Sequence, residues 1–184
     1  PFFEDILMLV NKAIEKYSSV YYLEQKVSAL LEIKEDDIEA ATCAAREINP
    51  FIQDDIISIY FRYKYNHLDT KDYLEIERIV ESKGILNPES SIFLYKNGFL
   101  LIISSRQFAK NNIYDILNPY EAFFKNKAVK NFTAGVSKIH HLKEDLAYAI
   151  KESIYASSFT EEQADAPFIA FDCLGSYQAI LQFS

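Results

Sequence analysis

The feature that most constrains the fold of this chain is an apolar hairpin at residues 91–105. Two runs of aliphatic and aromatic residues flank the dipeptide Asn97-Gly98. Asn-Gly is the strongest short-range signal for a two-residue type I′ turn, because both central residues of that turn have positive φ. The sequence therefore predicts two antiparallel strands joined tightly at Asn97 and Gly98, and the fold must contain a sheet that includes them.

Helical periodicity dominates the chain before this hairpin. Apolar residues recur at helical spacing over 3–17 and 20–31, with a predicted break at Ser18-Ser19. A third helix is predicted over 36–47. Acids in its first turn suit the helix macrodipole, and its expected inner face is formed by Ile38, Ala41, Ala45 and Ile48.

The period changes to that of strands after Asn49-Pro50. The predicted order is a strand over 56–63, a helix over 70–82, the hairpin, a helix over 113–126, a strand over 131–138, a helix over 142–157 and a strand over 168–173. This alternation predicts an α+β fold with one mostly antiparallel, ferredoxin-like sheet and helices packed on it, preceded by N-terminal helices. We expect a helical linker region over 1–48 and a domain over 49–184.

The first helix has two interpretations. Phe3, Val10 and Tyr17 fit heptad a positions, and Ile6 and Ala13 fit d positions, as in the tail of a longer signalling helix that enters from upstream. The alternative is an ordinary amphipathic helix that packs on its own domain. We also expect the chain to be part of a longer protein.

Charge and cysteine content restrict the partners and the compartment. The net charge of −8 speaks against a nucleic-acid surface on this chain. The sequence contains neither a signal peptide nor an apolar run long enough to cross a membrane, so we expect a cytoplasmic protein. Cys43 and Cys173 are predicted to be small buried apolar residues in a reducing compartment, with a disulfide or a reactive thiol as the alternative.

Residues 133–155 resemble the strand, loop and helix that follow the signature hairpin of GGDEF-type, nucleotide-cyclase-type domains. They are more similar to the degenerate GGDEF-like domain of bacterial transcriptional regulators of the CdaR/PucR type. Asp172-Cys-Leu-Gly-Ser-Tyr177 resembles an Asp-Leu-Gly-x-Tyr segment of that family, and residues 30–50 resemble the helices and turn before its first strand. The resemblance covers residues 27–181 by pattern more than by identity. It implies a helix-turn-helix DNA-binding domain downstream and a sensor upstream.

Enzymes of the GGDEF type hold a divalent metal on acids at the end of the first strand and on the hairpin. Here residues 61–65 and 95–99 contain no acid, and Asp69 and Asp72 are better explained as first-turn acids of a helix. Without carboxylates a Mg²⁺ ion lacks the oxygen ligands that it prefers. We therefore expect no metal, no cofactor, no catalytic residues and no enzymatic activity.

Other candidate groups carry little chemistry. His140 and His141 are adjacent and point in different directions on a helix or strand, which makes them a poor metal pair; they and His67 are expected in loops. The acidic group Glu161, Glu162 and Asp165 is expected to be a solvated surface.

Three functions stay open on the sequence alone. The favoured one is a non-enzymatic signalling and dimerisation module of a transcriptional regulator, which forms a homodimer and reaches DNA only through a domain outside this chain. The second is a small-molecule receptor in which Arg62, Lys64 and Lys96 meet an anionic effector, although such residues at strand ends also serve to block edge pairing. The third is an active cyclase.

Overall fold

The computed structural model describes residues 2–34, 36–63, 88–96, 98–104, 132–159 and 168–178. The helices expected over 70–82 and 113–126 lie outside these residues. So do several residues singled out in the sequence: Lys64, His67, Asp69, Asp72, Asn97, Glu161, Glu162 and Asp165. Within the described part the α+β prediction is confirmed: N-terminal helices precede a five-stranded sheet, on which a further helix packs.

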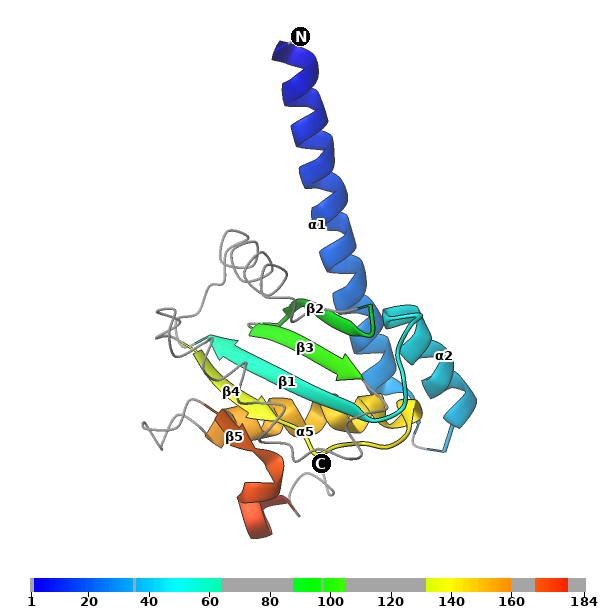
Figure 1. Ribbon diagram of the computed structural model, residues 1–184, viewed down its shortest axis with the longest axis vertical. Coiled ribbons are helices and arrows are strands. Elements are labelled where there is room, and N and C mark those ends of the chain that lie inside the picture. The colour runs from blue at the N-terminus through cyan, green and yellow to red at the C-terminus, as the bar shows by residue number, and fades with distance from the viewer. Residues whose placement is uncertain are drawn as a thin grey trace.

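The sheet has the strand order β2-β3-β1-β4-β5 (Figure 1). Its strands are β1 (Ile56–Tyr63), β2 (Ser90–Tyr95), β3 (Gly98–Ser104), β4 (Phe132–Val136) and β5 (Phe168–Ala170). β1 pairs antiparallel with both β3 and β4, β2 pairs antiparallel with β3, and β4 pairs parallel with β5. The sheet is therefore mostly antiparallel, as the sequence predicts.

β1 is the central strand and has the predicted bounds. Residues 56–61 are all buried, which agrees with a run that is apolar on both faces. Helix α5 (Leu146–Phe159) packs on β1 and β4, and it is preceded by a short 3-10 turn, η2 (Lys143–Asp145). The predicted helix over 142–157 therefore begins a few residues later than expected.

One hydrophobic core joins the N-terminal helices to the sheet. Its buried members come from α1 (Phe2–Glu32), α2 (Ile38–Ile48), the sheet and α5; they include Val27, Leu30, Ala45, Ile48, Ile56, Tyr60, Leu100, Leu146 and Ile150. Residues on both sides of position 48 thus share one core. The boundary between 48 and 49 stays a prediction.

The N-terminal helices differ from expectation in two respects. α1 is continuous from Phe2 to Glu32, so the predicted break at Ser18-Ser19 is wrong. Serine is only a few tenths of a kcal/mol (roughly 0.5) less favourable than alanine inside a helix, which is too little to interrupt so long a segment. In α2, Asp37 is the N-cap and its Oδ1 accepts a hydrogen bond from Ala40 N at 3.0 Å, while Ile38, expected on the inner face, is 60% exposed.

The turn of the hairpin lies one residue earlier than predicted. Tyr95 pairs with Gly98, so β2 ends at Tyr95 and the turn begins at Lys96, which has a φ of 49°. Gly98 is the first residue of β3, and its φ is not left-handed. A Cβ at Gly98 would collide with the carbonyl oxygen of Phe61 and lie 2.6 Å from Cζ of Tyr60. The glycine is therefore required by close approach of β1 and not by the turn itself.

The C-terminal part of the described chain also corrects two expectations. The last strand ends at Ala170, and residues Phe171–Tyr177 form a 3-10 segment, η3, instead of extending the strand to residue 173. Cys43 and Cys173 are both exposed, so the prediction that they are buried is wrong. Among the described helices, none has both the length and the hydropathy needed to span a bilayer.

Candidate functional site

Two groups of residues that make polar contacts lie at opposite ends of β1. The first, which we call the α1–turn junction, consists of Glu24, Tyr60, Tyr95, Lys96 and Gly98. The second, which we call the α5 polar cluster, consists of Lys138, His140, Asp145, Glu152 and Asp172. β1 approaches the junction with Arg62, which pairs with Gly98, and approaches the cluster with Ile56, which forms an isolated bridge with His140.

The α1–turn junction is held by two directional hydrogen bonds. The backbone N–H of Lys96 donates to Oε1 of Glu24 on α1, with 2.9 Å between the two atoms. The Tyr60 hydroxyl donates to the backbone carbonyl oxygen of Tyr95 at 3.1 Å. The Lys96 ammonium also lies over the face of the Tyr95 ring, 5.4 Å from its centre. The turn is therefore fixed both to α1 and to the central strand.

Burial keeps the Tyr60 phenol neutral. Tyr60 is 5% exposed, and this desolvation raises its pKa to about 12. The positive charge of Arg62 acts in the opposite direction, while Tyr95 and the carboxylate of Glu24 raise the pKa further. A neutral phenol keeps its proton, so the hydrogen bond to Tyr95 persists over the physiological pH range.

A surface ion pair adds a second attachment of α1. Lys26, two residues after Glu24, pairs with Glu47 on α2, and hydrogen bonding to this carboxylate is the main cause that raises the pKa of Lys26. Because the side chains of Lys26 and Glu47 are 26% and 48% exposed, water screens the pair and it contributes little to stability. The attachment of α1 rests mainly on Val27 and Leu30, which are 0% exposed.

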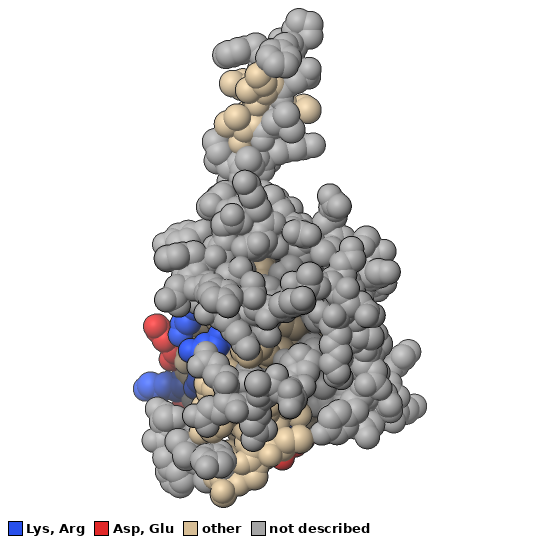
Figure 2. Space-filling model, turned by 90° about the vertical axis from the view of Figure 1, so that its left-hand side faces the viewer, with Lys and Arg blue, Asp and Glu red and all other residues tan. Residues whose placement is uncertain are grey.

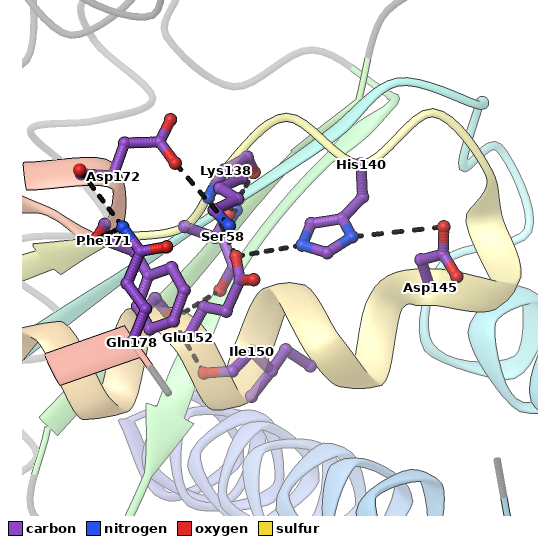
Figure 3. Close-up of polar contacts among 11 residues, drawn as sticks. Ser58, Lys138, His140, Asp145, Ile150, Glu152, Phe171, Asp172 and Gln178 are labelled. Atoms are coloured by element: carbon purple, nitrogen blue, oxygen red, sulfur yellow. Dashed lines mark hydrogen bonds and ion pairs between the residues drawn. The ribbon is translucent and has the colours of Figure 1, made fainter. Parts of the chain in front are cut away.

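The α5 polar cluster is centred on a buried carboxylate (Figure 3). Glu152 on α5 is 8% exposed. Its Oε2 atom accepts a hydrogen bond from the backbone N–H of Lys138 at 3.0 Å and lies 3.0 Å from Nε2 of His140. The other ring nitrogen of His140, Nδ1, lies 4.0 Å from Oδ2 of Asp145. The imidazole is thus placed between two carboxylates.

Serine hydroxyls continue this network into the sheet. Ser58 N donates to Oγ of Ser137 at 2.9 Å, and the hydroxyls of Ser58 and Ser153 lie 2.9 Å apart. Ser58, Ser137 and Ser153 are all 0% exposed. In the described part of the chain, His140 contacts carboxylates and backbone rather than a hydroxyl or a thiol. The cluster therefore fixes a loop and lacks the nucleophile–base geometry of an acyl-transfer site.

The η3 segment is attached to the same loop. The Lys138 ammonium lies 3.9 Å from Oδ1 of Asp172 and 5.1 Å from the centre of the Phe171 ring. The side-chain amide of Gln178 donates to the backbone carbonyl oxygens of Phe171 and Asp172, at 3.0 and 3.1 Å. The loop after β4 thus connects β1, α5 and η3.

The structure gives the two adjacent histidines different partners, and it brings together two of the three basic residues singled out in the sequence. His140 and His141 lie in one loop and have different partners, since Nδ1 of His141 is 2.6 Å from Oδ1 of Asp55. Arg62 and Lys96 lie at the same end of the sheet, whereas Lys64 lies outside the described residues.

Sequence reasoning did not single out Glu24 or Glu152. Glu152 had a signal, because an acid three residues after Ala149 and four before Ala156 falls on a buried side of the helix. Glu24 lies on α1, which also carries an exposed acid at Glu32. The sequence therefore does not show which acid of this helix has a partner, because the partner of Glu24 comes from a distant segment.

Within the described ranges, no three His, Cys, Asp or Glu residues come together in a way that could hold a metal ion. Comparisons with known protein families, with curated proteins and with solved structures found no match to this chain.

Proposed function

We propose that this chain is a non-enzymatic signalling and dimerisation module of a bacterial transcriptional regulator, which couples an upstream sensor to a helix-turn-helix domain outside this chain. The observation that supports this proposal is the two-part character of α1. Near its N-terminus Ile6, Leu7, Met8 and Val10 are 42–55% exposed, whereas Val27 and Leu30 are fully buried in the core. One continuous helix therefore joins an uncovered apolar surface to the centre of the domain.

The exposed part of α1 requires a partner on physical grounds. Successive helical residues are about 100° apart, so exposure at positions 6, 7 and 8 means that the helix is uncovered on several sides. This end of α1 also stands clear of the body of the molecule (Figure 2). Most helical stability in proteins comes from tertiary packing of an apolar face, and isolated helical segments are marginal in water. A second copy of the chain, or the sensor, supplies that cover.

Charge and ligand chemistry support a regulatory role over an enzymatic one. The net charge is −8, so contact with DNA is assigned to the separate helix-turn-helix domain. Residues 61–65 and 95–99 carry no acid at the positions where a cyclase holds its metal. The proposed location is the cytoplasm, where such regulators meet DNA.

The oligomeric state of the chain tests the dimerisation part of the proposal. We expect a dimer by sedimentation analysis, and we expect Leu7→Asp with Val10→Asp to give a monomer whose far-UV circular dichroism loses no more helix than the first turns of α1. Asn11→Asp, an exposed polar position on the same helix, is the matched control and should leave the dimer intact. A monomeric parent chain at micromolar concentration would contradict dimerisation.

Direct assays test the other two parts. We expect no affinity for duplex DNA at low salt and no product from Mg²⁺ with GTP or ATP. Tight sequence-specific DNA binding by this chain alone, or nucleotide turnover that scales with enzyme concentration, would refute the corresponding part of the proposal.

One observation favours a second function, the binding of a small anionic effector. Thr133 on β4 is 4% exposed, and its Oγ1 atom has no hydrogen-bond partner among the residues described. It lies directly opposite Arg62 in the β1–β4 ladder. Residues directly opposite in a ladder project from the same face of the sheet, so the buried Thr133 hydroxyl shares a face with the cationic Arg62, which suits a carboxylate or phosphate group. A thermal-shift screen with sugar diacids, purines and nucleotides should give a stabilising ligand whose effect is lost in Arg62→Gln, and the absence of any shift would remove this alternative.

A further inference from the structure

We propose that Glu24 couples the position of α1 to the conformation of the β2–β3 turn, so that displacement of α1 releases Lys96 from its left-handed conformation. The contact is a property of the fold, while its use as a relay rests on the proposed signalling function. The hydrogen bond from Lys96 N to Glu24 Oε1 links residues 72 positions apart in the chain. It joins the helix with the uncovered apolar end to the hairpin.

The turn needs external support. Lys96 has a φ of 49°, a conformation that is unfavourable for a residue with a Cβ and that glycine or asparagine adopts more readily. The carboxylate of Glu24 accepts the N–H group of this very residue at 2.9 Å. A hydrogen bond to an ionised acceptor is stronger than one between neutral groups. Glu24 therefore favours the left-handed conformation over the alternatives that Lys96 would otherwise populate.

A small movement of α1 is sufficient to break this contact. A hydrogen bond weakens steeply beyond about 3.2 Å, so a displacement of roughly 1 Å removes it. Val27 and Leu30, one to two turns after Glu24, are fully buried, so the helix cannot slide without disturbing the core. Rotation or tilt of α1 therefore moves the carboxylate and the core side chains together.

The effect of the turn continues into the sheet. Tyr95, next to Lys96, is 2% exposed, and its carbonyl oxygen accepts the hydrogen bond from Tyr60 at 3.1 Å. Gly98, on the other side of the turn, has no space for a side chain because Tyr60 and the backbone of Phe61 lie against it. A change in the conformation of Lys96 therefore alters the contacts of Tyr60 and Phe61 in β1, the central strand.

Amide hydrogen exchange measured by NMR tests the contact itself. In Glu24→Ala we expect the Lys96 amide to exchange about tenfold faster than in the parent chain, which is the effect of losing one charge-assisted hydrogen bond. Glu24→Gln, which retains a carbonyl acceptor, should show a smaller increase. Glu32→Ala, an exposed acid on the same helix, is the control and should leave Lys96 unchanged. Equal exchange of Lys96 in Glu24→Ala and Glu32→Ala would overturn the proposal.

A second experiment tests transmission from α1. The chain is joined at its N-terminus to a dimeric leucine zipper in two helical phases that differ by two residues, and the chemical shift of the Lys96 amide is recorded in each. We expect the shift to differ between the two phases in the parent sequence and to be equal in Glu24→Ala. Equal shifts in the parent sequence would reject the relay. Tight DNA binding by this chain alone, or a monomeric parent chain, would instead reject the proposed function and would leave this contact in place.

Discussion

Replacement of Gly135 by alanine is the most severe single methyl addition that the described structure predicts. Gly135 lies in β4 opposite Tyr60, at the place where α5 crosses the sheet. A Cβ at this position would collide with the backbone oxygen of Ser153 and the backbone nitrogen of Ser157, and it would lie 2.8 Å from the carbonyl carbon of Ala156. All three atoms belong to the main chain of α5, so no side-chain rotation removes the clash.

The magnitude follows from what must move. α5 has to withdraw from the sheet, although its residues Leu146, Ala149 and Ile150 are 0% exposed and hold it there. Overpacking of a core typically costs about 1–3 kcal/mol, and a gap of roughly 0.5–1 Å forfeits a quarter to a half of the dispersion attraction across an interface. We therefore expect Gly135→Ala to lower the free energy of unfolding by about 3–5 kcal/mol, at the upper end of single substitutions.

Urea denaturation followed by far-UV circular dichroism measures this change. With an m-value of about 2 kcal/mol/M, the midpoint should fall by roughly 2 M. Gly175→Ala is the matched control, because a Cβ at Gly175 meets no atom within 4 Å. That variant should lose about 1–3 kcal/mol from backbone strain alone, since Gly175 combines a φ of 54° with a ψ of −126°, a conformation that disfavours alanine. If Gly135→Ala proves no more destabilising than Gly175→Ala, the reasoning from close helix–strand approach is refuted.

Three further predictions address α1, the α5 polar cluster and the phenol at the junction. Leu30→Ala should lower the free energy of unfolding of the monomer by about 2–5 kcal/mol, while Leu7→Ala, at 53% exposure, should change it by less than about 0.5; equal losses in denaturation of the monomer would contradict the two-part description of α1. Glu152→Ala should cost about 2–4 kcal/mol because the part-buried backbone N–H of Lys138 and the ring of His140 lose their carboxylate partner, and an unchanged midpoint in the same assay would show that the loop does not depend on this carboxylate. The raised pKa of Tyr60, about 12 against 10.0, means that the folded state retains this proton after the unfolded state has lost it. Stability should therefore fall between pH 10 and 12, by up to about 3 kcal/mol from this group, and Tyr60→Phe should show a shallower decline; identical pH profiles would disprove this assignment.

Local sequence signals were sufficient for the sheet. β1 has the predicted bounds because its β-branched and aromatic residues form a continuous run that a helix does not favour. The alternation of helices and strands also gave the α+β class, since few other arrangements bury one face of each element. These features depend on residues within a few positions of one another.

The turn and the cysteines required tertiary information. Gly98 suggested a turn, yet its small size serves the approach of Tyr60 from the neighbouring strand, and Lys96 takes the left-handed conformation instead. Cys43 lies among apolar residues in the sequence, but it is two positions before the buried Ala45 and therefore about 200° away around α2. Apolar neighbours in the sequence do not decide which side of a helix faces the core.

The candidate site was even less accessible to sequence reasoning, because its important contacts join distant segments. Lys96 N and Glu24 are 72 residues apart, and Ser58 and Ser153 are 95 residues apart. Neither pair belongs to a motif with fixed spacing. A sequence pattern identifies which elements form, whereas the identity of such pairs depends on how those elements cross.

The placement of the two polar groups gives β1 a particular mechanical role. Tyr60 and Arg62 connect its C-terminal end to the turn that α1 holds, and Ile56 connects its N-terminal end to the loop that carries His140 and, beyond it, η3. A strand hydrogen-bonded on both edges moves as a unit, since bending it breaks several ladder bonds at once. Displacement at the α1–turn junction is therefore expected to reach the loop as a rigid shift of β1, without any local unfolding between the two ends. On this reasoning the hydroxyl pair of Ser58 and Ser153 holds β1 to α5, and the carboxylate of Glu152 holds the loop of Lys138 and His140 to the same helix.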